Sequence, residues 1–136
     1  MREITVEAAV DQIKPVTDFV NQQLDALACS TQIRIQIDVA IDEIFSNIAR
    51  YAYSEKEGKA TVRVDVEKDP LSIIITFSDY GEPFDPLSKE TPNTIGLPAR
   101  KRPIGGLGLF MVRKTMDAVS YSYEKGQNIL KIRKKI

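Results

Sequence analysis

The sequence predicts an α+β fold, a two-layer α/β sandwich in which helices pack on one face of a mixed, mostly antiparallel sheet. Apolar residues recur at helical spacing through residues 8–51, alternate with polar residues through residues 62–79, and show both patterns again after residue 106. Two layers bury all of the resulting apolar faces. The 136 residues contain no internal repeat and no dividing linker, so we expect a single domain over residues 1–136.

The first part of the chain should form a short strand and a helix. Residues 4–6 are typical of an opening strand, and apolar residues then recur at helical spacing over residues 8–27. Pro15 lies inside this run. Because proline lacks the amide hydrogen that a helix interior needs, the helix either begins near Pro15 or is kinked there.

A second helix shows the clearest pattern in the chain. Ser30 or Thr31 can cap its N-terminus. The helix should end near Tyr51 or Tyr53, before a polar turn at residues 54–58. Five isoleucines fall on one of its faces, which we expect to lie in the core: Ile33, Ile37, Ile41, Ile44 and Ile48.

The rest of the chain returns to strands, with one long interruption. Residues 62–66 and 71–77 alternate with period two about Asp69-Pro70, which predicts an antiparallel hairpin. Residues 82–104 hold five of the seven prolines and no sustained period, and a loop of this length is usually functional or disordered. We then expect a helix over residues 107–117 and a closing hairpin that turns within residues 124–128.

Composition excludes several classes of protein. Lys plus Arg and Asp plus Glu both total 19, so no net charge draws the chain to nucleic acid or to an anionic membrane. Histidine is absent, which excludes histidine-based catalysis, histidine metal ligands and phosphohistidine. Cys29 is the only cysteine, and no apolar stretch is long enough to span a bilayer. We therefore expect a cytoplasmic protein that contacts neither nucleic acid nor membrane directly.

A carboxylate continues the core-facing row of the third predicted strand. Side chains alternate between the two faces of a strand, so one face carries Leu71, Ile73, Ile75, Phe77 and Asp79. A carboxylate on such a face needs hydrogen-bond donors, and the exocyclic amine of adenine is a suitable one. The other interpretation is that Asp79 has left the strand and caps a turn through Gly81.

A polar pair on the second helix could supply a base and a metal ligand. Glu43 and Asn47 lie four residues apart and so share a face beside the isoleucines. A carboxylate can act as a general base, and an amide oxygen is a ligand that Mg²⁺ accepts. The same pattern is typical of a solvated helix face, and Asp42 and Ser46 share this ambiguity.

A glycine-rich segment opens the third predicted helix. Glycines let backbone amides approach an anion closely, and the helix points its positive end at the same place. The segment consists of Gly105, Gly106, Leu107 and Gly108 and follows the basic residues Arg100, Lys101 and Arg102. Taken alone, the glycines could equally form a tight turn and the basic residues a solvated loop.

Together these segments resemble the motifs of the GHKL ATPases, which bind ATP in the Bergerat fold. Residues 43–53 resemble the N box, residues 79–81 the adenine-binding box, and residues 105–109 the glycine box that ends a mobile ATP lid. Within that superfamily, the compact length and the phrases at residues 81–86 and 108–117 are similar to the anti-sigma factor serine kinases of bacterial partner-switching systems. The resemblance covers essentially the whole chain.

The resemblance implies a role for each motif residue. Asp79 would accept the adenine amine while Gly81 lets the base approach, Asn47 would bind Mg²⁺ with ATP or ADP, and Glu43 would be the general base. The phosphates would be held by Gly105, Gly106, Leu107 and Gly108, with Arg100 supplying charge, and residues 84–104 would form the lid. Two features depart from the family: Tyr51 stands where histidine is frequent, and the lid is rich in proline.

The implied function is phosphoryl transfer from Mg-ATP to a serine or threonine of a STAS-domain anti-anti-sigma protein. The kinase would sequester a sigma factor on another surface, and relatives are often homodimers. The alternative is a nucleotide-gated binding protein without kinase activity, or one with a target other than a sigma factor. The presence of Glu43 favours the kinase. The absence of histidine disfavours a fragment of a sensor histidine kinase.

Overall fold

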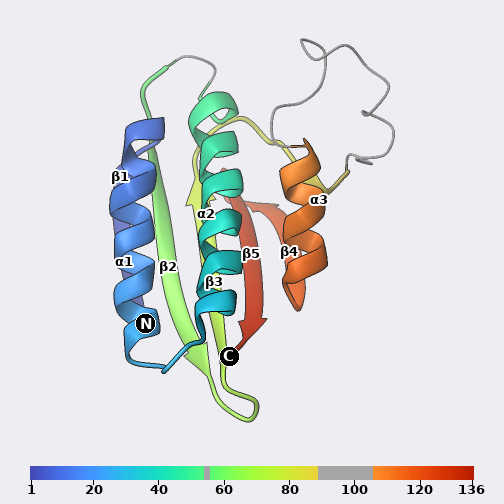
Figure 1. Ribbon diagram of the computed structural model, residues 1–136. Helices are drawn as coiled ribbons and strands as arrows, with labels where there is room; N and C mark the ends of the chain where they lie inside the picture. Colours follow the sequence, from blue (N-terminus) through green and yellow to red (C-terminus); the bar gives the residue numbers. More distant parts are fainter. Residues whose placement is uncertain (54–55, 89–105) are drawn as a thin grey trace.

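The computed structural model describes residues 1–53, 56–88 and 106–136 and places three helices over one face of a five-stranded sheet (Figure 1). The elements occur in the expected order. They are β1 (Arg2–Glu7), α1 (Ile13–Asp25), α2 (Thr31–Tyr51), β2 (Lys59–Glu67), β3 (Ser72–Asp79), α3 (Gly106–Thr115), β4 (Ala118–Glu124) and β5 (Gln127–Lys135), with short 3₁₀ turns at Val10–Gln12 and Pro86–Ser88. The predicted α+β sandwich is confirmed.

The sheet has the strand order β1-β2-β3-β5-β4, and its pairings within the described ranges are all antiparallel. A partly parallel sheet was expected. The antiparallel arrangement follows from the connections, because the two helices between β1 and β2 return the chain to the same end of the sheet, and hairpins join β2 to β3 and β4 to β5.

Local sequence explains where the first two helices begin. α1 starts at Ile13, so Pro15 lies in its first turn, where a missing amide hydrogen costs nothing. Of the two alternatives, the helix begins near the proline. Ser30 caps α2, since its side-chain oxygen accepts a hydrogen bond from the Ile33 amide at 3.3 Å.

The core lies between the sheet and the apolar faces of the helices. In α2 the central isoleucines Ile37, Ile41 and Ile44 are buried, and Phe45 and Phe77 are the largest fully buried side chains. Alternate residues of β3 face this core as predicted, with one correction. β3 begins at Ser72, so Leu71 precedes the strand and is exposed instead of continuing the core-facing row.

The closing hairpin turns more tightly than expected. Lys125 and Gly126 both have positive φ, 52° and 80°, which gives a two-residue connection that matches the twist of β4 and β5. β5 consequently begins at Gln127, and Asn128 lies in the strand instead of the turn. None of the helices in the described ranges combines the length and the apolarity that crossing a bilayer requires.

Candidate functional site

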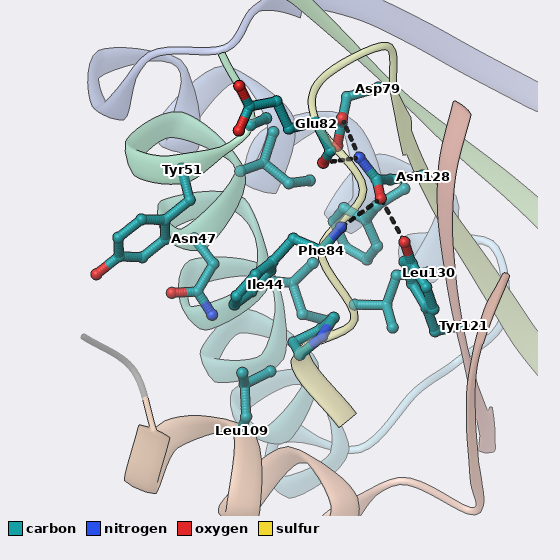
Figure 2. Close-up of a pocket in the computed structure, with 14 residues that line it drawn as sticks. Ile44, Asn47, Tyr51, Asp79, Glu82, Phe84, Leu109, Tyr121, Asn128 and Leu130 are labelled. Atoms are coloured by element: carbon teal, nitrogen blue, oxygen red, sulfur yellow. Dashed lines mark hydrogen bonds between the residues drawn. The ribbon is translucent and has the colours of Figure 1, made fainter. Parts of the chain in front are cut away.

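A pocket lies between α2, the end of β3 and the first turn of α3 (Figure 2). Its walls are largely apolar and include Ile44, Phe77, Leu109 and Leu130. Polar side chains reach it from several elements. They are Asn47 of α2, Asp79 of β3, Tyr121 of β4 and Asn128 of β5, with Glu82 from the loop after β3. An apolar pocket with a few convergent polar groups is the usual form of a small-molecule site.

Asp79 is the last residue of β3 and is only 5% exposed. Its Oδ1 atom accepts hydrogen bonds from the Gly81 amide at 2.8 Å and from Asn128 Nδ2 at 3.0 Å. Both interpretations of this residue are therefore correct, since it belongs to the core-facing row and also caps the turn through Gly81. Among the described residues, no hydrogen bond reaches Oδ2, so this oxygen can accept from a ligand.

Asn47 lines the pocket, and its side-chain oxygen is buried. The side chain is 8% exposed, and no hydrogen-bond donor within the described ranges reaches its Oδ1 atom. An unsatisfied buried acceptor costs about 1–3 kcal/mol. A hard cation such as Mg²⁺ would satisfy it, and this ion keeps several waters when few protein oxygens bind it. In the described part of the chain, His, Cys, Asp and Glu form no group of three suited to a metal.

Glu43 lies one turn before Asn47 and faces the first turn of α3. A Cβ atom at Gly108 would lie 1.9 Å from Glu43 Cδ and 2.0 Å from Oε2, so a larger residue here would displace this carboxylate. Burial raises the pKa of Glu43, the negative charge of Asp42 raises it further, and Arg50 opposes the rise. A carboxylate whose pKa is raised towards neutral pH is better suited to accept a proton.

Gly81 fixes the loop after β3 against the C-terminal end of α2. A Cβ atom at this position would lie 2.0 Å from the carbonyl oxygen of Ala52. The same oxygen accepts a hydrogen bond from the Glu82 amide at 2.8 Å. Tyr53 also connects this loop to the end of α2. Its hydroxyl accepts a hydrogen bond from the Tyr80 amide at 2.9 Å and donates one to the Lys59 carbonyl.

The predicted phosphate site lies partly within the described residues. Gly106 and Leu107 form the first residues of α3, and Gly108 follows them beside Glu43. Residues 89–105 lie outside the described residues. They include Arg100, Gly105 and most of the expected lid. The described beginning of that lid is residues 84–88, which include the short turn at Pro86–Ser88.

Two features of the site were not predicted from the sequence. Asn128 and Tyr121 form a hydrogen-bonded pair beside Asp79, although a polar residue near a hairpin turn and an alternating tyrosine carry no pattern that indicates a ligand site. Tyr51 stacks on Phe84, with ring centroids 5.9 Å apart and an angle of 30° between the planes. The residue that departs from the family pattern thus contacts the first residue of the expected lid.

The chain matches one protein family and is similar to several curated proteins. The histidine kinase-like ATPase domain family matches residues 6–134. Similar curated proteins include a serine-protein kinase RsbW of Bacillus mycoides, 31% identical over 93 residues, which are 68% of this chain and 58% of that protein. Another is the serine-protein kinase RsbW of Listeria innocua, 31% identical over 98 residues, or 69% of this chain and 61% of that protein.

The chain spans about three fifths of the length of the curated relatives it matches. The family match itself is nearly complete, since only the first five and the last two residues fall outside it. It confirms the resemblance that the three motifs indicate. The chain belongs to the histidine kinase-like ATPase domain family.

Proposed function

We propose that this protein is an anti-sigma factor serine kinase that binds Mg-ATP or Mg-ADP in the pocket and phosphorylates a partner protein. The observation that carries the proposal is that Asp79 and Asn47 line one pocket, with an unsatisfied oxygen on Asn47. Glu43 does not line this pocket and lies one helical turn away, against Gly108 of α3. We further propose that residues 1–136 are one domain, with a lid over about residues 84–104.

In the proposed complex, each side chain has one task. Asp79 Oδ2 accepts a hydrogen bond from the adenine amine, and Gly81 lets the loop after Asp79 pack closely on the end of α2. The apolar walls exclude water from the base. Asn47 binds Mg²⁺, which neutralises phosphate charge when it is bound. The backbone amides of Gly105, Gly106, Leu107 and Gly108 hold the phosphates, and Arg100 adds positive charge.

Glu43 acts as the general base in this proposal. It accepts the proton of a serine or threonine hydroxyl while that oxygen forms a bond to the γ-phosphorus and the bond from phosphorus to the ADP oxygen breaks. Phosphoryl transfer depends chiefly on positioning and charge neutralisation, so a base, a metal ligand and a phosphate cradle are sufficient. The packing of Glu43 against Gly108 holds the base beside the proposed cradle.

The partners are proposed from the family resemblance and from the names of the relatives, which are serine-protein kinases. We propose a STAS-domain anti-anti-sigma protein as the substrate and a sigma factor as the second partner. Phosphorylation of the substrate would decide which partner is held. We also propose a cytoplasmic location and a homodimer as the working form.

Nucleotide binding is tested by thermal unfolding with and without Mg-ATP. We expect Mg-ATP to raise the Tm of the wild type, because a ligand that binds only the folded state stabilises it. Asp79→Asn and Asn47→Ala should lose most of this rise, whereas Asp18→Asn on the exposed face of α1 should keep it. An unchanged Tm of the wild type at saturating nucleotide would refute the ATP site.

Kinase activity needs a separate assay. We expect transfer of labelled phosphate from ATP to a STAS-domain protein encoded beside this gene, and Glu43→Gln should abolish transfer while it keeps the rise in Tm. If the wild type binds nucleotide but transfers nothing to any STAS protein tested, the alternative of a nucleotide-gated binding protein is favoured. If Glu43→Gln transfers at the normal rate, Glu43 is not the base.

A further inference from the structure

Asn128 is a buried side chain that connects four parts of the site (Figure 2). It lies in β5 directly opposite Asp79 of β3 in the antiparallel register. Its Nδ2 atom donates to Asp79 Oδ1 at 3.0 Å and to the Glu82 carbonyl at 2.8 Å. Its Oδ1 atom accepts from the Phe84 amide at 3.1 Å and from the Tyr121 hydroxyl.

These contacts allow only one orientation of the Asn128 amide. If the oxygen and nitrogen were exchanged, the oxygen would face the carboxylate of Asp79 and the NH₂ group would face the Phe84 N–H. Burial raises the pKa of the Tyr121 phenol, so this hydroxyl keeps its proton and donates to Asn128 Oδ1. Tyr121 therefore holds the orientation that Asp79 requires.

The first consequence concerns the carboxylate of Asp79. Asn128 and the Gly81 amide both donate to Oδ1, and together they hold the side chain in one rotamer. Among the described residues, both hydrogen bonds to this carboxylate go to Oδ1, so Oδ2 stays available to a ligand. The oxygen that meets a ligand is thus selected by Asn128.

The second consequence concerns the loop after β3. Asn128 binds the Glu82 carbonyl and the Phe84 amide, and so fixes the backbone on both sides of Pro83. The ring of Phe84 then lies in the pocket wall and stacks on Tyr51. One side chain therefore fixes both the carboxylate and the neighbouring wall of the pocket.

We propose that Asn128, oriented by Tyr121, is a positioning residue that makes the site select 6-aminopurine over 6-oxopurine nucleotides. This inference rests on the proposed nucleotide site. A fixed Oδ2 accepts from the 6-amino group of adenine but meets the 6-oxo group of hypoxanthine as a second acceptor, which leaves both oxygens unpaired. A carboxylate free to rotate could instead accept from the N1–H of hypoxanthine, and discrimination would fall.

The test compares the Kd values of Mg-ATP and Mg-ITP, two nucleotides that differ at position 6 of the purine. For the wild type we expect tighter binding of Mg-ATP. In Asn128→Ala the ratio of the two Kd values should fall about tenfold, the equivalent of one hydrogen bond. Tyr121→Phe should lower the ratio in the same direction by a smaller factor. The control is Tyr123→Phe, an exposed tyrosine on the same strand, which should leave the ratio unchanged.

A purely structural role would weaken both nucleotides equally, so an unchanged ratio in Asn128→Ala would overturn the proposal. If Asn128→Ala does not fold, Tyr121→Phe decides, because it removes one hydroxyl and keeps the ring, and an unchanged ratio there is equally decisive. If the wild type binds neither nucleotide, the proposed ATP site fails. If it binds both with the preference for ATP intact in every variant, only the role of Asn128 fails.

Discussion

The carboxylate of Glu43 occupies the space that a side chain at Gly108 would need. A Cβ atom added to Gly108 would lie 1.9 Å from Glu43 Cδ, far closer than any real contact. The two residues come from α2 and α3, which pack together directly. The position of the proposed base is therefore set by the first turn of another helix.

Gly108→Ala should separate catalysis from stability. The atom it meets is the end of a flexible side chain, so the carboxylate can move aside while the backbone stays in place. Because alanine favours helix over glycine, we expect the free energy of unfolding to change by less than about 1 kcal/mol. A base displaced by about 1 Å should lower phosphoryl transfer about 100-fold. Urea unfolding and the transfer assay measure the two effects, and a normal rate would contradict the proposed position of the base.

Gly81→Ala, in contrast, should lower the stability of the fold as well as nucleotide binding. Here the added Cβ atom would lie 2.0 Å from the carbonyl oxygen of Ala52, a backbone atom of the residue that caps the C-terminus of α2 and not the end of a flexible side chain. The loop would have to leave α2 and lose the hydrogen bond from the Glu82 amide to Ala52. We expect a loss of about 1–3 kcal/mol in the free energy of unfolding and weaker nucleotide binding. A stable variant with normal affinity would show that this contact is unimportant.

The pKa of Glu43 predicts how activity depends on pH. Burial raises this pKa, Asp42 adds to the rise and Arg50 opposes it. The base must be ionised, so activity should fall as pH drops through the raised pKa. Asp42→Asn removes a negative charge, lowers the pKa and should move the acidic limb of the kcat/KM profile to lower pH. Arg50→Gln should move it to higher pH. Shifts in the same direction for both variants would refute this account.

Asn47→Leu should raise the free energy of unfolding and weaken the Mg²⁺-dependent binding of nucleotide. The wild-type side chain buries an oxygen with no partner among the described residues, and an apolar side chain of similar size removes that cost. Without nucleotide we expect the free energy of unfolding to rise by about 1 kcal/mol. The Mg²⁺-dependent part of the nucleotide-induced rise in Tm should be lost. Urea unfolding and Tm measurements with and without Mg²⁺ test this, and a less stable variant would argue against an unsatisfied oxygen.

Much of the fold could be predicted because its patterns are local. The isoleucine spacing of α2, the alternation in β2 and β3 and the proline in the first turn of α1 each depend on residues close in sequence. Apart from the expected parallel pairing in the sheet, the errors occurred where an element begins or ends. Leu71 continues the alternation of β3 but lies before the strand, and Asn128 follows a turn that closes after only two residues.

The sequence by itself determined the order of the elements, the core-facing row that ends at Asp79 and the motifs that identify the family. Only the tertiary structure decided that Asn128 lies opposite Asp79, 49 residues away, and that Glu43 lies against Gly108. The physical reason is that both contacts depend on how separate elements are aligned. The register between β3 and β5 and the packing of α2 on α3 are set by the whole core, and no local spacing encodes them.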